Sequence, residues 1–290
     1  MMPDCDHNRL PVCSGEQRYR SLRQQRKGSM RPHHESAIRK LAEHFAKQQD
    51  CLAVIVGGSI AKGLDKEDSD IDAFLVLTDE ACKAKWDRND FFYWTGDFCD
   101  YPGGYIDAKI IDLGYLRAAA ERANEVTRAA FKDVLIPLCK LPEIRDLVAR
   151  IATYQPQEQR DKIQRFYAQF ECAFWYVGEA ARRDDRYLLN HAATELILYG
   201  GRLILAHNQV LYPYHKLFMD ELRAAPEKPE NLMELIDALL ETPGAETARA
   251  FYDAIRRFRW WNEAGELWHV RYMRDTELAW LHNRDYVADI

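Results

Sequence analysis

The sequence predicts an α/β domain with a small mixed sheet, followed by an all-α helical bundle. As far as about residue 140, short apolar runs of strand length alternate with helical patterns, whereas only helical patterns follow. The length of 290 residues also suits about two domains. We therefore expect a poorly ordered basic arm over residues 1–30, the α/β domain over residues 31–145, and the helical bundle over residues 155–290.

The α/β domain is predicted to open with a helix, because the apolar residues of ESAIRKLAEHFAKQ return every three or four positions. CLAVIV has strand length and ends at two glycines, and DIDAFLVL and YIDAKIIDL have a similar character. Thr78, followed by acidic residues, predicts a helix start after the second strand. VLIPLC predicts a short fourth strand or an apolar turn. The expected elements are a helix at 35–48, strands at 51–56, 70–77 and 105–113, a helix at about 115–124, and the fourth run at 134–139.

The second half is predicted to be a bundle of amphipathic helices. Apolar residues recur at helical spacing in IQRFYAQFECAFWYVGEAARR, and YLLNHAATELILYGGRLILAHN and MELIDALLE continue the pattern. The segment RRFRWWN mixes cations with aromatic rings, a combination that can stack on nucleic-acid bases. Its aromatic residues also fall at core spacing within a longer helical pattern, which favours packing over base stacking.

Charge and cysteine content exclude several classes of protein. The net charge of −6 argues against a general polyanion binder, so a nucleic-acid partner is not favoured, although a short basic arm leaves it open. The seven cysteines are an odd number and form no CxxC pair, which indicates neither a disulfide framework nor a zinc site. No apolar run reaches the length of about 18 residues that a membrane helix needs. We expect a cytoplasmic protein without a membrane partner.

The stretch GGSIAKGLDKEDSDID, residues 57–72, combines a glycine-rich turn with two aspartates. Asp70 and Asp72 lie two positions apart in a predicted strand, so their side chains leave the same face. Carboxylates held in this way repel each other unless a cation lies between them, and Mg²⁺ prefers oxygen ligands while keeping positions open for phosphates. The pair therefore predicts a Mg²⁺ site, which we expect to hold two ions.

The other end of the stretch predicts a phosphate site. Glycine lets backbone N–H groups approach a ligand closely, and Ser59 together with the start of a short helix offers donors to an anion. Gly58 and Ser59 are the candidate phosphate-binding residues. A triphosphate held beside Mg²⁺ suits nucleotidyl transfer, in which a hydroxyl attacks the α-phosphorus in line.

This chemistry favours a third carboxylate on a neighbouring strand. Asp107 lies within the strand YIDAKIIDL, where an acidic residue is costly unless it has a purpose. Asp112 lies at the end of that strand, where a helix cap explains it. We therefore assign Asp107 to the site, as a third metal ligand and the expected base. Lys109 shares the face of Asp107 and suits either a carboxylate or a phosphate partner.

The pattern Gly58-Ser59-x-Ala61-x-Gly63, followed by Ser69-Asp70-Ile71-Asp72, resembles the signature of the DNA polymerase β-type nucleotidyltransferase superfamily. In that superfamily the two motif aspartates bind Mg²⁺, the Gly-Ser turn holds the triphosphate, and a third aspartate completes the site and often serves as base. The resemblance implies these roles for Asp70, Asp72, Gly58, Ser59 and Asp107. The motif covers residues 57–72, and the α/β pattern extends the resemblance to about residue 140.

A small catalytic domain followed by a helical bundle further resembles the antibiotic nucleotidyltransferases, which transfer AMP from ATP to a hydroxyl of an aminoglycoside or lincosamide. In that group the helical domain closes over the nucleotide and supplies basic residues to the phosphates. Here Lys216 and Arg202, in GGRLILAHNQVLYPYHKLF, are the candidates for that role. The resemblance implies ATP as co-substrate and a small hydroxyl-bearing molecule as acceptor. The aromatic segment 86–105 is expected as a loop bordering the acceptor pocket.

Three other functions remain open. One is a nucleotidyltransferase that modifies a protein or tRNA, as in toxin–antitoxin-type relatives. Another is a helical RNase of the HEPN class, whose R-x4-H spacing is matched by Arg186 and His191, although a helix-start arginine and a helix-facing histidine also explain this pair. The last is a catalytically silent nucleotide-binding module. Retention of all three acids on adjacent predicted strands disfavours a silent module.

Overall fold

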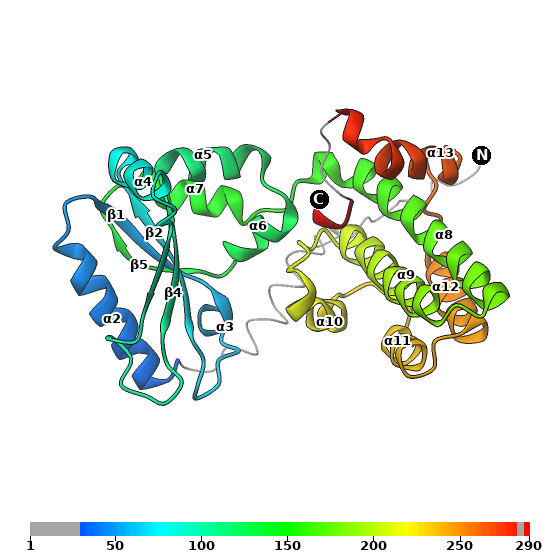
Figure 1. The fold of residues 1–290 in the computed structure, drawn as a ribbon, viewed down its shortest axis with the longest axis horizontal. Helices are drawn as coiled ribbons and strands as arrows, with labels where there is room; N and C mark the ends of the chain where they lie inside the picture. The colour runs from blue at the N-terminus through cyan, green and yellow to red at the C-terminus, as the bar shows by residue number, and fades with distance from the viewer. Residues whose placement is uncertain (1–29, 283–286) are drawn as a thin grey trace, which may run out of the picture.

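The computed structural model describes residues 30–282 and 287–290. The basic arm expected over residues 1–30 therefore lies outside the described residues, apart from Met30. Figure 1 shows a sheet-containing domain followed by a helical domain, as the sequence predicts. No helix in the described part of the chain is both long and apolar enough to cross a membrane.

Within the described residues, five strands form one mixed sheet in the order β3-β4-β2-β1-β5. Strands β2 and β4 are parallel, whereas the other three neighbouring pairs are antiparallel. The predicted small mixed sheet is confirmed. Its strands are β1 (Cys51–Val56), β2 (Ile71–Leu77), β3 (Phe92–Thr95), β4 (Ile106–Ile111) and β5 (Leu135–Cys139).

Strand β3 was not predicted, because the aromatic segment 86–105 was expected to be a loop. The strand is four residues long, lies at the edge of the sheet and pairs only with β4. Its side chains are exposed or half-buried, so the sequence carries no apolar alternation typical of a core strand. Antiparallel pairing with β4, the next strand along the chain, is what makes it a strand.

Helices cover both faces of the sheet (Figure 1). The helix α2 (Pro32–Ala46) packs on one face through Leu41 and Phe45, joined there by Cys82 of α4 (Asp79–Trp86). The opposite face packs against apolar residues of three other helices. These are α5 (Leu113–Arg122), α6 (Glu125–Ala130) and α7 (Glu143–Ile151). The short α3 (Gly58–Ala61) follows β1 directly.

The sheet domain extends further than predicted. Residue 145 falls inside α7, and the apolar residues Ile144, Leu147 and Ile151 of that helix pack on the sheet. A short 3₁₀ turn, Pro156–Glu158, then leads into the first helix of the second domain. The sequence indicates the boundary only approximately, because α7 has the same amphipathic pattern as the bundle helices that follow.

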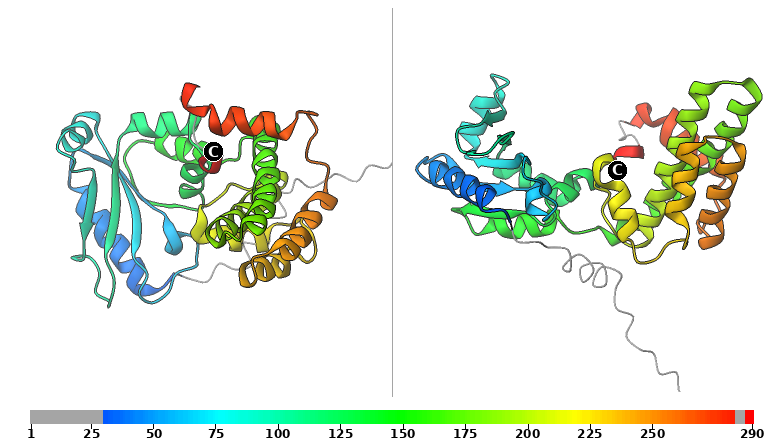
Figure 2. Two further views of the ribbon diagram at one scale, coloured as in Figure 1. Left: turned by 45° about the vertical axis from the view of Figure 1, so that its right-hand side comes forward. Right: turned by 90° about the horizontal axis from the view of Figure 1, so that it is seen from below.

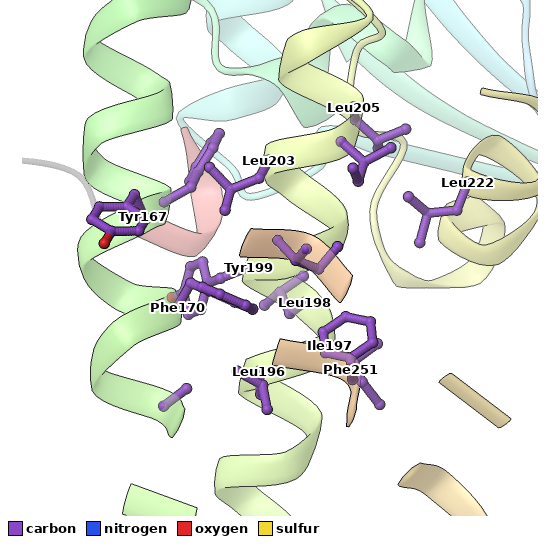
Figure 3. Close-up of a cluster of buried hydrophobic side chains, with 14 of the residues drawn as sticks. Tyr167, Phe170, Leu196, Ile197, Leu198, Tyr199, Leu203, Leu205, Leu222 and Phe251 are labelled. Atoms are coloured by element: carbon purple, nitrogen blue, oxygen red, sulfur yellow. The ribbon is translucent and has the colours of Figure 1, made fainter. Parts of the chain in front are cut away.

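The helical domain is built around two long antiparallel helices, α8 (Gln159–Arg183) and α9 (Arg186–His207). Figure 3 shows part of its core, where Tyr167 and Phe170 of α8 meet Tyr199 of α9 and Phe251. Trp261 is buried and Phe258 packs against the same core, whereas Trp260 is exposed, so the RRFRWWN segment packs into the core through two of its three aromatic residues. The remaining helices are α10 (His215–Ala224), α11 (Leu232–Glu241), α12 (Ala245–Phe258) and α13 (Trp268–Tyr272).

The two domains are joined by a buried ionic cluster. Glu125 of α6 is 2% exposed and accepts hydrogen bonds from Lys162 of α8 at 3.1 Å and Arg202 of α9 at 3.3 Å. The same carboxylate accepts a hydrogen bond from the backbone N–H of Tyr212 at 3.1 Å. One residue of the sheet domain thus neutralises two cations of the helical domain. This fixes α10, which follows Tyr212, on the side of the bundle nearest the sheet (Figures 1 and 2).

Candidate active site

The register of the sheet brings the predicted carboxylates together. Asp72 of β2 lies directly opposite Asp107 of β4 in the parallel pair. Directly paired residues share one face of a sheet, so the two carboxylates are neighbours on adjacent strands. Asp70 lies two residues before Asp72, immediately ahead of β2. Asp72 and Asp107 on adjacent strands, with Asp70 just ahead of β2, therefore form one group of neighbouring carboxylates.

The glycine turn lies against this carboxylate group. A Cβ placed on Gly58 would lie 1.9 Å from Asp72 Oδ2, and the φ of Gly58 is +65°, so glycine is required on both counts. The backbone N–H of Gly57 donates to the carbonyl of Asp72 at 2.9 Å. The first N–H groups of a helix have no acceptor within the helix, and α3 begins at Gly58. The candidate phosphate donors and metal ligands thus belong to one site.

Hydrogen bonds to Ser69 hold the loop that immediately precedes Asp70. The hydroxyls of Ser59 and Ser69 lie 3.5 Å apart, and Ser69 Oγ accepts a hydrogen bond from the N–H of Lys66 at 2.8 Å. The hydroxyl of Tyr101 donates to the carbonyl of Ser69 at 2.9 Å. The turn that carries Ser59 and the loop that carries Asp70 are therefore tied to each other and to the aromatic segment.

The loop between these two ends is anchored by α2, which sequence reasoning missed. Asp65 lies in an acidic run typical of a surface loop, yet its side chain is 6% exposed and pairs with Arg31 at 2.8 Å and His34 at 3.0 Å. Burial alone would raise the pKa of Asp65, but hydrogen bonds from Arg31 and His34 lower it overall. The partners are about thirty positions earlier in the chain, so no local pattern reveals the pair.

The electrostatics of the carboxylate group suit a cation. The pKa of Asp72 is raised, first by removal of solvent and then by the charges of Asp70 and Asp107, while Lys216 and Lys109 oppose the rise. The pKa of Asp107 is also raised by removal of solvent, with Lys109 acting against it and Asp70 with it. Asp72 and Asp107 are therefore less stable in their ionised forms than they would be in water. A bound divalent cation would reverse this.

The donor set fits Mg²⁺ in kind, because it consists of carboxylate oxygens from a rigid sheet. Among residues 30–282 and 287–290, however, no group of three or more His, Cys, Asp or Glu side chains is arranged as a ready-made metal site. Asp70, Asp72 and Asp107 are thus neighbours rather than a closed cage. Mg²⁺ is commonly bound through one or two carboxylates plus substrate phosphates, and the open arrangement agrees with that mode.

Lys216 and Arg202, the two cations assigned to the phosphates, have different environments. Lys216 is exposed on α10, and its charge opposes the rise in the pKa of Asp72, so Lys216 stays a candidate for the site. The prediction for Arg202 is wrong. Its side chain is 0% exposed, pairs with Glu125 and donates to the carbonyls of Ala288 and Ile290. Arg202 therefore stabilises the domain junction.

The assignment of Asp107 as the third carboxylate also agrees with the surroundings of the alternative residue, Asp112. Asp112 precedes α5 and caps it, accepting a hydrogen bond from the N–H of Tyr115 at 2.6 Å. This is the helix-cap role expected for it. Asp107 has no such structural duty and lies opposite Asp72. Tyr105, which the sequence did not single out, lies close enough to Asp70 for the carboxylate to raise the pKa of the tyrosine.

The R-x4-H pair lies at the start of α9. Arg186 and His191 are both exposed, and a separation of five residues places them about 140° apart around a helix axis. They therefore do not share one helix face within this chain. The ring of His191 is stacked with that of Tyr187, at a centroid distance of 6.3 Å. The described structure gives the RNase hypothesis no paired site.

Comparison with known proteins agrees with the geometry. Residues 38–115 match the family model of a nucleotidyltransferase domain, a segment that contains the Gly58–Ser59 turn and all three aspartates. Residues 38–115 of the sheet domain are therefore a nucleotidyltransferase domain by sequence.

A solved structure, described as a nucleotidyltransferase-like protein from Exiguobacterium sibiricum 255-15, is similar at 11% sequence identity and a TM-score of 0.43. The match covers 78% of this chain and 74% of that protein. No curated protein sequence matches the chain.

Proposed function

We propose that the protein is a Mg²⁺-dependent nucleotidyltransferase that transfers AMP from ATP to a hydroxyl of a small molecule such as an aminoglycoside-like antibiotic. The observation that carries the proposal is the placement of Asp72 between Gly58 on one side and Asp107 on the other. A phosphate-binding turn, a metal ligand and a candidate base then follow one another across the sheet. The choice of ATP and of a small-molecule acceptor rests on the resemblance to antibiotic nucleotidyltransferases.

Each residue has a defined part in this proposal. Gly58 and Ser59 hold the triphosphate through backbone N–H groups and the serine hydroxyl. Asp70, Asp72 and Asp107 would hold Mg²⁺, which when bound neutralises charge on the phosphate oxygens. Lys216 adds a cation from the helical domain beside Asp72.

The transfer itself is an in-line displacement. The acceptor hydroxyl oxygen forms a bond to the α-phosphorus, the bond from that phosphorus to the bridging oxygen of pyrophosphate breaks, and pyrophosphate leaves. Asp107 is the candidate base that accepts the hydroxyl proton, because it is a carboxylate directly opposite Asp72 on the neighbouring strand.

The proposal is tested by incubating the full chain with Mg²⁺ and ATP labelled at the α-phosphate, together with an aminoglycoside, a lincosamide, tRNA or bulk protein. We expect label on a small-molecule acceptor, and none when Asp70→Ala and Asp72→Ala are combined. Label on tRNA or protein instead would show that the acceptor is a macromolecule. Absence of label on every acceptor, together with absence of Mg²⁺-dependent ATP binding, would reject the proposal.

The RNase hypothesis is separated by the same variants. His191→Ala should leave nucleotidyl transfer unchanged, because His191 is exposed on α9 and belongs to the helical domain. Activity that survives loss of Asp70 and Asp72 but is abolished by His191→Ala would assign the function to the helical domain.

A further inference from the structure

The candidate site continues beyond Asp107 onto an aromatic surface. Trp94 of β3 lies directly opposite Asp107 in the β3–β4 pair, just as Asp72 lies opposite Asp107 on the other side. Adjacent strands are about 4.8 Å apart, so Asp107 has Asp72 and Trp94 as its two cross-strand neighbours on one face. Trp94 is 62% exposed, although it belongs to the sheet.

Two further rings adjoin Trp94. The ring of Tyr105 lies 6.0 Å from that of Trp94, with 35° between the two planes. Phe92 is two residues from Trp94 on the same strand, hence on the same face, and is 48% exposed. We call Phe92, Trp94 and Tyr105 the aromatic strip. Within the described residues, the indole N–H of Trp94 has no hydrogen-bond partner, so neither core packing nor a polar contact accounts for its position.

The order of groups across the sheet indicates which substrate the aromatic strip would contact. Gly58, at the phosphate end, lies beside Asp72 on the β1 side of β2, whereas Trp94 lies on the opposite side, beyond Asp107. If the triphosphate occupies the Gly58 end and Asp107 takes the proton of the acceptor, the body of the acceptor extends away from the triphosphate. The next residue in that direction is Trp94.

We propose that Trp94 is the platform on which a ring of the acceptor stacks, with Tyr105 as the adjoining wall. The inference rests on the proposed function and names a positioning residue for its second substrate. Aromatic faces bind the apolar faces of saturated rings and attract cations. The neighbouring carboxylates also favour positive charge. The expected acceptor is therefore a small hydroxylated ring compound with neutral or amino substituents rather than acidic ones.

The first test measures steady-state kinetics with ATP and the aminoglycoside kanamycin A or the lincosamide lincomycin. Trp94→Ala should raise the KM for the acceptor by roughly tenfold to a hundredfold, the range expected for loss of one stacking contact, and leave the KM for ATP unchanged. Trp94→Phe should recover most of the loss. Trp260→Ala is the matched control, because Trp260 is 63% exposed but belongs to the helical domain. An unchanged acceptor KM in Trp94→Ala would overturn the inference.

A second test needs no turnover and therefore separates this inference from the proposed function. The seven tryptophans are labelled with 5-fluorotryptophan, and the Trp94 resonance is assigned by its loss in Trp94→Phe. Kanamycin A or lincomycin, added with Mg²⁺ and a non-hydrolysable ATP analogue, should shift the Trp94 resonance and leave that of Trp260 in place. If neither compound shifts the Trp94 resonance, the assignment of Trp94 as the platform is overturned, even if transfer to another acceptor is observed.

Strand β3 is also an edge strand, which could pair with a second copy of the chain. Sedimentation of the wild type and of Trp94→Ala addresses this alternative. We expect the same oligomeric state for both. A dimer that dissociates in Trp94→Ala would make the aromatic strip an interface and would overturn its assignment to the acceptor.

Discussion

Gly58 lies in direct contact with Asp72, and any Cβ on Gly58 would lie 1.9 Å from the carboxylate oxygen Oδ2. The contact joins the two halves of the motif, which are separated by a loop that α2 anchors through Asp65. It also explains why a glycine with a positive φ follows β1 at this point. The phosphate turn and the carboxylate cannot be changed independently.

The first prediction concerns this contact. Gly58→Ala should lower nucleotidyl transfer by at least about a hundredfold, because the new methyl group must displace Asp72 from its position, and a small misplacement at a reacting centre has an effect of this size. Gly265→Ala is the matched control. Gly265 has a φ of +66°, almost that of Gly58, but a Cβ there meets no atom within 4 Å. Activity assays and denaturation of both variants separate the two effects.

Both substitutions should cost a similar free energy of about 1 kcal/mol for the left-handed backbone. Only Gly58→Ala should lose activity. Equal activity in the two variants would show that Gly58 is required for its backbone conformation alone, and that the contact with Asp72 has no part in the site.

The second prediction distinguishes the two aspartates of β4 and its following turn. Asp107→Asn should reduce transfer by at least about a hundredfold with little effect on stability, since it keeps the shape of the side chain but removes the base. Asp112→Ala should do the opposite. It removes the cap of α5 and should lower the free energy of unfolding by about 1 kcal/mol while transfer persists. The reverse outcome in the same assays would assign the third carboxylate to Asp112.

The third prediction concerns the ionic cluster between the domains. Glu125→Ala leaves Arg202, which is 0% exposed, and Lys162, which is 8% exposed, without their buried counter-charge. We expect a loss of about 3–5 kcal/mol in the free energy of unfolding, measured by chemical denaturation. Glu227→Ala is the control, because Glu227 is 65% exposed in its pair with His207 and should change stability by less than about 1 kcal/mol. Similar effects in both would contradict a structural role for Glu125.

The fourth prediction concerns pH. Burial, with the neighbouring charge of His33, lowers the pKa of His34 from its ordinary value of 6.5, and the opposing influence of Asp65 does not restore it. Protonation then favours the unfolded chain, so this contribution to stability is complete above pH 6.5 and is lost as the pH falls below that value. His34 alone can contribute at most about 1.4 kcal/mol per pH unit.

Denaturation at several pH values between 7.5 and 5 checks this expectation. His34→Gln should flatten the fall in stability that the wild type shows toward acid pH. His44→Gln, on the exposed side of the same helix, should keep the slope of the wild type. If His34→Gln leaves the slope of stability against pH unchanged, another group is responsible for the acid sensitivity.

Much of the fold and the site was predictable because the responsible patterns are local. The run from Cys51 to Val56 carries its own strand signal, and the spacing of Asp70 and Asp72 alone puts them on one face. Asp107 is predictable because an acidic residue inside a strand is costly unless it has a purpose. The register of β2 and β4 places it opposite Asp72.

What the sequence did not reveal depends on contacts between separate segments of the chain. Strand β3 exists only through its contact with β4, and the anchoring of Asp65 needs Arg31 and His34 at the start of α2. The sequence does not exclude Arg202 as a phosphate ligand, because an arginine in a helix has the same local pattern whether it faces solvent or a buried glutamate. Glu125, its partner, is 77 positions away in the chain, so no local pattern signals the pair.

The central claim is that Asp70, Asp72 and the Gly58 turn form one site for a metal-bound triphosphate. Calorimetric titration of a non-hydrolysable ATP analogue into the full chain, with and without Mg²⁺, tests it most directly. We expect binding that requires Mg²⁺ in the wild type, and a loss of at least about tenfold in affinity when Asp70→Ala and Asp72→Ala are combined. Equal affinity in the wild type and the double variant, in the presence of Mg²⁺, would contradict the account.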